Sequence, residues 1–228
     1  MVSAMPMNFI FMLTRLDQTV SDCMDVMNDI ESLDIKHLGF KDVGVSPSTL
    51  MELNRRIKAT GAISYMEVVS TSKEACLHSA RVAREIGVDR LLGGTHVEEV
   101  LGILQGSSTK YYPFPGRPFN HPTKLGGSAA EVEEQCRKFQ QMGCAGVDLL
   151  AYRATEADPL DLVRAARKGT DGFLIVAGSV SKVEQMQALK KAGADAFTIG
   201  SAAFDGSFSP LKGSLRSQLK DILDACRD

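Results

Sequence analysis

The chain has 228 residues, 44% of them hydrophobic, which suits one domain with a single sizeable core. Its 26 basic and 28 acidic residues are interspersed and leave a formal net charge of −2, so the composition does not favour binding to nucleic acid or to a membrane. No apolar run is long enough to cross a bilayer, no signal-peptide pattern precedes the first apolar stretch, and five scattered cysteines have no metal-binding spacing. We therefore expect a cytoplasmic protein with reduced thiols and without a bound metal or cofactor.

Apolar runs of strand length alternate with amphipathic, helix-like segments along the whole chain. The expected strands lie at 8–13, 38–43, 62–69, 89–92, 110–113, 146–151, 173–176 and 196–199. The first helix is expected at 19–33, and the last after Ser209-Pro210. Four capping-box patterns mark the starts of other helices, at 71–74, 95–98, 128–131 and 181–184. The stretch 113–127 reads as a long irregular loop.

Eight strand-helix units predict one (β/α)8 barrel over residues 1–228. An open, doubly wound sheet is the alternative, but the N-terminal strand is not followed by the G-x-G-x-x-G turn of a dinucleotide-binding fold.

The last two expected strands both end in a glycine-serine turn, Gly178-Ser179 and Gly200-Ser201. Small residues at such turns let main-chain N–H groups approach a ligand, and the loops after strands 7 and 8 of a barrel are a frequent phosphate site. We expect these four residues to bind a phosphate group. The alternative is that they are only tight turns.

Catalytic residues of a barrel lie at the carboxyl ends of the strands. Alternation along 38–43 turns Lys41 into the barrel, with Glu67 on the next strand and Asp148 across the barrel as expected carboxylate partners. A lysine beside carboxylates suits proton transfer next to a carbonyl, or a Schiff base on the lysine. The alternative is that Lys41 and Glu67 form a purely structural ion pair or face solvent.

Four further residues are weaker candidates for contacts with a substrate. Arg15 and Arg153 follow strand ends and could clamp an anionic group, although such arginines are often only solvated. His96 lies at a helix start, and His121 lies in the long loop, where it could close over a ligand.

The C-terminal third, from GVDLLAYRATEADPL through VAGSV to TIGSAAF, resembles the ribulose-phosphate-binding barrel superfamily of sugar-phosphate isomerases, epimerases, lyases and synthases. The resemblance implies that the two glycine-serine turns hold a substrate phosphate through main-chain amides. The first half departs from known branches: Tyr65-Met66-Glu67 stands where the decarboxylase branch has D-x-K-x-x-D, and the first strand lacks the aspartate of the histidine-pathway isomerases.

These observations predict an enzyme that binds a phosphorylated small molecule, a sugar phosphate, and isomerises or epimerises it with Lys41, Glu67 and Asp148. A Schiff-base aldolase using Lys41 and a non-catalytic barrel that senses a phosphate ester are the alternatives. Analogy with the superfamily also leads us to expect a homo-oligomer.

Overall fold

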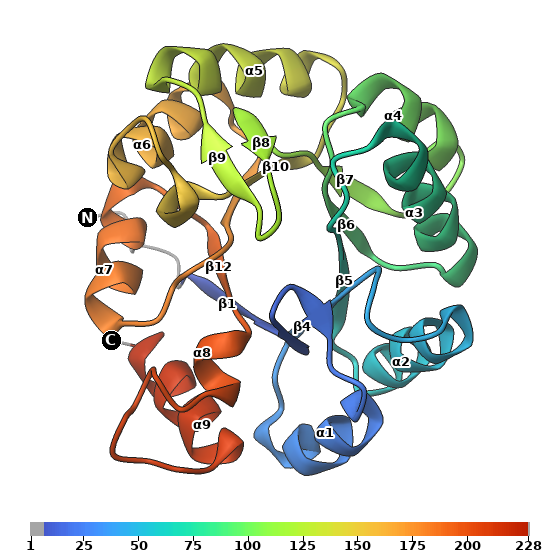
Figure 1. Ribbon diagram of the computed structural model, residues 1–228, viewed down its shortest axis with the longest axis vertical. Helices are drawn as coiled ribbons and strands as arrows, with labels where there is room; N and C mark the ends of the chain where they lie inside the picture. Colours follow the sequence, from blue (N-terminus) through green and yellow to red (C-terminus); the bar gives the residue numbers. More distant parts are fainter. Residues whose placement is uncertain (1–6, 228) are drawn as a thin grey trace.

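The computed structural model describes residues 7–227 as a ring of parallel strands surrounded by helices (Figure 1). The sheet has the order β10-β11-β12-β1-β4-β5-β6-β7. Its strands are β1 (Asn8–Met12), β4 (His37–Lys41), β5 (Ile63–Val68), β6 (Arg90–Gly93), β7 (Lys110–Tyr112), β10 (Gly146–Leu149), β11 (Phe173–Val176) and β12 (Ala196–Ile199). Main-chain hydrogen bonds from Ala145 to Tyr111 and from Asp148 to Pro113, each 3.0 Å long, join the two ends of the sheet. The strands therefore form the expected (β/α)8 barrel.

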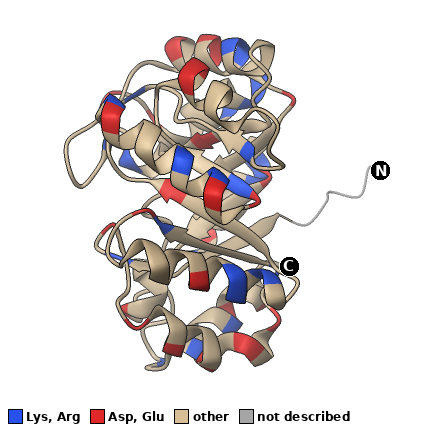
Figure 2. Cartoon of the chain, turned by 90° about the vertical axis from the view of Figure 1, so that its right-hand side faces the viewer, with Lys and Arg blue, Asp and Glu red and all other residues tan. Residues whose placement is uncertain are grey.

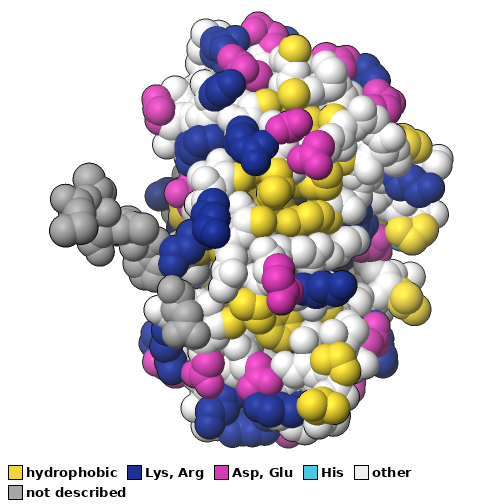
Figure 3. Space-filling model, turned by 90° about the vertical axis from the view of Figure 1, so that its left-hand side faces the viewer, with side chains coloured by type: hydrophobic (Ala, Val, Ile, Leu, Met, Phe, Trp, Pro, Cys, Tyr) yellow, Lys and Arg dark blue, Asp and Glu magenta, His cyan; other side chains and the backbone are white. Residues whose placement is uncertain are grey.

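The helices pack outside the strands in chain order. They are α1 (Cys23–Ile30), α2 (Pro47–Ala59), α3 (Lys73–Ile86), α4 (Val97–Leu104), α5 (Ala129–Gln141), α6 (Pro159–Gly169), α7 (Val183–Ala192), α8 (Ser201–Phe204) and α9 (Leu215–Ala225). Figure 2 shows acidic and basic residues mixed along the helices, and Figure 3 shows hydrophobic side chains between charged ones on the side opposite to that of Figure 2. Within residues 7–227, no helix is both long and apolar enough to cross a membrane.

Two short hairpins stand where the sequence analysis expected other structure. Residues 14–19 form β2 (Thr14–Arg15) and β3 (Gln18–Thr19), so α1 begins at Cys23 and the prediction of a helix from residue 19 was wrong. The stretch 113–127 is not irregular throughout, because it contains β8 (Arg117–Phe119) and β9 (Lys124–Gly126). Alternation over only two or three residues is too short to be distinguished from a loop.

The helix starts were predicted with mixed success. The capping box of Ser128 and Glu131 forms at α5, and Ser46 caps α2. The other three boxes do not form: Ser72 caps α3, and α4 and α7 begin without a side-chain cap. The last helix is capped by Ser214 instead of Ser209, so it begins five residues after Pro210.

Candidate functional site

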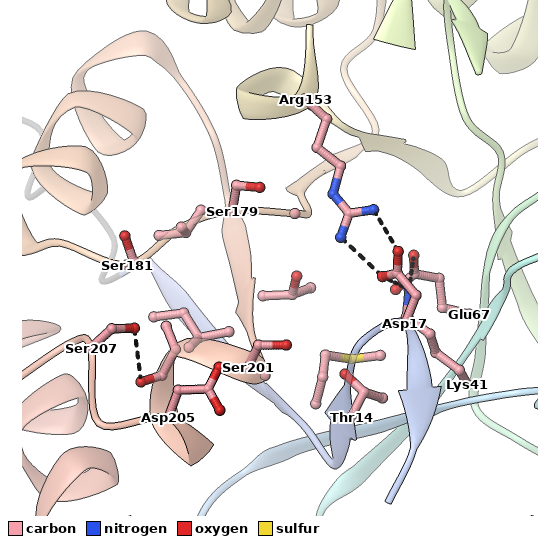
Figure 4. A pocket seen from close by; sticks show the side chains of 17 residues that line it. Thr14, Asp17, Lys41, Glu67, Arg153, Ser179, Ser181, Ser201, Asp205 and Ser207 are labelled. Atoms are coloured by element: carbon pink, nitrogen blue, oxygen red, sulfur yellow. Dashed lines mark hydrogen bonds and ion pairs between the residues drawn. The ribbon is translucent and has the colours of Figure 1, made fainter. Parts of the chain in front are cut away.

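A pocket of about 320 Å³ opens at the carboxyl ends of the strands (Figure 4). On one side it is lined by the turns that follow β11 and β12, and on the other by the β2–β3 hairpin, Lys41, Glu67 and Arg153. The side chains that line it are mostly polar, and none of them is aromatic. The pocket therefore suits a small polar ligand better than one that needs a ring to stack on.

The turns after β11 and β12 present main-chain donors to this pocket. Within the described residues, the N–H groups of Gly178, Ser179 and Ser201 donate no hydrogen bond. Ser179 has a left-handed φ of 61°. In turns with such a residue, successive main-chain N–H groups can point toward one anion. A Cβ atom on Gly200 would lie 2.8 Å from the carbonyl oxygen of Thr14, so only glycine lets the β2–β3 hairpin approach this turn. All four residues predicted to bind phosphate thus line one pocket.

Lys41 lies at the floor of the pocket between two carboxylates. Lys41 and Glu67 are register partners on β4 and β5, and their Nζ and Oε1 atoms are 3.1 Å apart. The second partner is Asp17, at the tip of the β2–β3 hairpin, with Oδ1 2.9 Å from the same Nζ. All three side chains are about 7% exposed, so this is a desolvated ion cluster.

The local structure around Asp17 explains how it reaches the cluster. Thr19 fixes the hairpin to β4, because its hydroxyl accepts a hydrogen bond from the Lys41 N–H and donates one to the Lys41 carbonyl. Leu16 and Asp17 form the two-residue turn, with φ angles of 50° and 58°. These left-handed angles are costly for residues other than glycine, asparagine and aspartate, so the ion pairs of Asp17 must help to hold the turn.

Arg153 connects the ion cluster to the phosphate-binding turns. It ends the short 3₁₀ turn Ala151–Arg153 after β10, and its Nη1 and Nη2 atoms donate to both oxygens of Asp17 at 3.0 and 2.9 Å. Its Nε atom lies only 2.5 Å from where a Cβ atom of Gly178 would be, and it donates no hydrogen bond to the described residues. The guanidinium group thus has one edge on Asp17 and leaves the Nε–H near the turn of Gly178.

The protonation states in the cluster follow from burial and neighbouring charges. Burial lowers the pKa of Lys41, but the carboxylates of Glu67 and Asp17 outweigh it and raise the pKa above its ordinary value. Burial raises the pKa of Asp17, but Arg153 and Lys41 outweigh it and hold that pKa well below its ordinary value. Lys41 is therefore an ammonium ion and Asp17 a carboxylate at neutral pH.

Asp148 lies in a different environment from that expected. It is fully buried, it does not line the pocket, and neither of its carboxyl oxygens has a hydrogen-bond partner within the described residues. The expected ion pair with Lys41 is thus absent, since Asp17 and Glu67 hold the ammonium group. Burial and the nearby charge of Glu67 raise the pKa of Asp148 well above its ordinary value, which favours the uncharged form of its carboxyl group.

The remaining candidates lie outside the pocket. Arg15 is exposed and paired with Asp205, whose own side chain lines the pocket rim. His96 is the residue before α4, and His121 is exposed between β8 and β9. None of these three lines the pocket. Within residues 7–227, no group of three histidine, cysteine or acidic side chains could hold a metal ion.

Asp17 is the residue that the sequence analysis missed. Its segment, Leu16-Asp17, lacks the glycine or asparagine that marks a tight hairpin turn, and it was assigned to the link before the first helix. One signal was available: Asp17 stands five residues after the end of β1, where the loops of a barrel carry functional residues.

No protein-family model and no curated protein sequence matches the chain. Solved structures do match over almost its full length. Orotidine 5′-phosphate decarboxylase from Pyrococcus horikoshii OT3 has a TM-score of 0.65 and 14% identity, covering 96% of this chain and 99% of that one. A mutant tryptophan synthase α-subunit from Pyrococcus furiosus has a TM-score of 0.64 and 15% identity, with coverage of 96% and 98%.

A third match is the BexX/CysO complex from Amycolatopsis orientalis, with a TM-score of 0.63, 15% identity and coverage of 97% and 88%. Sequence identities this low show the fold alone. The (β/α)8 barrel is therefore confirmed, and the matches do not indicate one branch of barrel enzymes.

Proposed function

We propose that the chain is an enzyme that binds a phosphate monoester of a small carbonyl compound and moves a proton next to the carbonyl group. The observation that carries the proposal is one pocket that joins main-chain donors without partners to a buried lysine-carboxylate cluster. The phosphate lies against Gly178, Ser179 and Ser201, where the N–H groups and the Nε–H of Arg153 supply donors.

The acid-base chemistry falls to Glu67 and Lys41. Oε2 of Glu67 accepts no hydrogen bond from the described residues, and the side chain lines the pocket, so this oxygen can take a proton from carbon. The electron pair of the broken C–H bond moves onto the carbonyl oxygen, and the Lys41 ammonium group stabilises the resulting enolate. Return of the proton to the neighbouring carbon completes an isomerisation, and return to the opposite face an epimerisation.

The same contacts disfavour a Schiff base on Lys41. A nucleophilic amine must lose its proton, and here that would leave Asp17 and Glu67 as two buried negative charges facing a neutral group. Asp148 makes no hydrogen bond to Lys41, and we assign its buried side chain to the support of the floor, beneath the reacting atoms.

Ligand binding is tested first, by thermal unfolding with a panel of phosphorylated sugars. A ligand at about one hundred times its dissociation constant adds roughly 2.7 kcal/mol of stability. Ser179→Asp places a negative charge in the phosphate site, and Ser179→Asn is its matched control, because both residues tolerate a left-handed φ. We expect the ligand-induced rise in Tm to survive in S179N and vanish in S179D. No rise with any ester would contradict phosphate binding.

Proton transfer is tested with a ligand found in that panel. In D₂O the wild-type protein is expected to exchange the hydrogen next to the carbonyl, and Glu67→Gln to slow this exchange by about 10²- to 10⁴-fold while binding persists. Binding without exchange in the wild type would indicate a sensing barrel instead of an enzyme. A ligand adduct trapped on Lys41 by borohydride would indicate the aldolase.

A further inference from the structure

The anion now held between Lys41 and Arg153 is a carboxylate of the chain itself. Asp17 receives the Lys41 ammonium group at 2.9 Å and both terminal nitrogens of Arg153 at 2.9 and 3.0 Å. These cations come from β4 and from the 3₁₀ turn after β10, so they converge on Asp17 from different sides of the pocket (Figure 4). A guanidinium fork and an ammonium group aimed at one point form a carboxylate-binding arrangement.

Apart from the ion pairs of Asp17, the contacts around the tip of the β2–β3 hairpin hold it only weakly. Leu16 is 82% exposed, so its side chain makes few packing contacts. Leu16 and Asp17 both have left-handed φ angles, which are unfavourable for leucine. The neighbouring Arg15–Asp205 ion pair is exposed and contributes little. The tip therefore depends on the ion pairs of Asp17, and an anion that replaced Asp17 would release it.

The position of Asp17 relative to the phosphate-binding turns determines which kind of ligand could replace it. Asp17, Gly178, Ser179 and Ser201 line the same pocket of about 320 Å³. Arg153 spans the two, with Nη1 and Nη2 on Asp17 and Nε beside Gly178. A small molecule with a phosphate at one end and a carboxylate at the other would use both edges of the guanidinium group.

We propose that Asp17 occupies a carboxylate subsite in the unliganded protein, and that the substrate is a phosphate monoester bearing its own carboxylate, which displaces Asp17 and swings the β2–β3 tip outward. This inference rests on the proposed function and narrows its substrate class from sugar phosphates in general to phosphorylated keto acids. The Lys41 ammonium group then faces the substrate carboxylate next to the reacting carbon.

The first test compares two esters that differ by one group, glycerol 3-phosphate and 3-phosphoglycerate. Asp17→Asn removes the competing charge and keeps the size of the side chain. We expect D17N to bind 3-phosphoglycerate about tenfold more tightly than the wild type, because the ligand no longer competes with the charge-assisted hydrogen bonds of Asp17. The affinity of D17N for glycerol 3-phosphate should stay within about twofold of the wild-type affinity. Equal or weaker binding of 3-phosphoglycerate by D17N would overturn the proposal.

Movement of the tip is measured separately. The chain contains no tryptophan, so Leu16→Trp gives a single fluorescent reporter at an exposed position. We expect 3-phosphoglycerate to change its emission and glycerol 3-phosphate to leave it unchanged. The same response to both esters would mean that the phosphate alone moves the tip, against the proposal.

A third measurement separates this inference from the phosphate site. If neither of these esters nor any phosphorylated sugar of the panel binds the wild type or D17N, the proposed function fails, and acetate then decides the subsite. In Asp17→Ala the vacated space faces Lys41 and Arg153, so acetate should raise its Tm more than the same concentration of sodium chloride, without doing so in the wild type. Equal effects of the two salts on D17A would overturn the carboxylate subsite.

Discussion

The two ends of the barrel each hold a cation, and they hold it by opposite means. At the carboxyl ends of the strands, Lys41 lies between the carboxylates of Asp17 and Glu67. At the amino ends, the guanidinium carbon of Arg90 lies 4.7 Å from the ring centre of Phe173, 5.2 Å from that of Tyr65 and 5.6 Å from that of Tyr112. An anionic ligand can replace a carboxylate beside Lys41, but it cannot replace the aromatic rings around Arg90. We therefore expect a ligand to bind by exchange only at the carboxyl ends of the strands.

The surroundings of each cation follow the same division. The Lys41 end has a pocket and donors without partners, whereas the guanidinium group of Arg90 lies among Tyr65, Tyr112 and Phe173, whose rings belong to or pack against the apolar cluster of the barrel interior. At the amino ends, Nδ1 of His37 and the hydroxyl of Tyr65 share a hydrogen bond of 2.9 Å. Burial, together with the charge of Arg90, lowers the pKa of His37 to about 4. A neutral histidine and a ring-bound arginine close the base of the barrel.

Lys41→Met removes the cation that lies between Asp17 and Glu67, and it has the largest expected effect on stability. It leaves two desolvated carboxylates without their cation, for which we expect a loss of about 3–5 kcal/mol in the free energy of unfolding. Urea unfolding measures this loss at neutral pH. Adding Asp17→Asn and Glu67→Gln to the same chain should recover part of it, and a triple variant no more stable than K41M would contradict the buried-charge explanation.

Asp148→Asn sharpens the comparison through pH. Because the pKa of Asp148 is raised in the folded protein, the unfolded chain releases this proton first, and stability falls as pH rises from the ordinary aspartate pKa toward the raised one. Each pH unit in this window costs the wild type about 1.4 kcal/mol that the variant does not lose. Unfolding by urea at pH 4.5 and 7.5 should show D148N gaining on the wild type at the higher pH. A constant difference would mean that Asp148 is ionised in the folded state.

These residues also show where sequence reasoning succeeds. The strands and the glycine-serine turns follow from local patterns that need no knowledge of distant contacts. The adjacency of Lys41 and Glu67 was predictable because alternation turns both inward and neighbouring parallel strands bring them into register. The same local patterns placed only one of the four predicted capping boxes correctly, because Ser72 takes the place of Thr71 as the cap of α3, and α4 and α7 begin without a side-chain cap.

The failures arise from tertiary contacts. Asp17 reaches Lys41 because a turn without glycine is held by ion pairs to residues 24 and 136 positions away, which no local pattern reports. Once Asp17 takes that place, Asp148 has no cation to pair with, and burial raises its pKa in the interior. One misread hairpin therefore accounts for both errors in the expected ion cluster.

Arg90→Met tests the second end. It removes cation-ring contacts worth about 0.5–1 kcal/mol each, but it also removes a buried Nη1 atom that has no hydrogen-bond partner within the described residues. We expect a net loss of about 1–2 kcal/mol in the free energy of unfolding and no change in ligand affinity. Loss of ligand binding in folded R90M would show that the two ends are coupled.

The smallest expected effect is that of Tyr65→Phe, which keeps the ring under Arg90 and removes only the hydroxyl that contacts His37 Nδ1. The lost hydrogen bond should cost about 1 kcal/mol of stability, measured by urea unfolding. Tyr65 also lies on β5, two residues before Glu67, with its side chain in the barrel interior. Proton exchange in D₂O by Y65F should therefore match the wild type if the base of the barrel only supports the fold, and a slower exchange would mean that packing in the interior sets the position of Glu67.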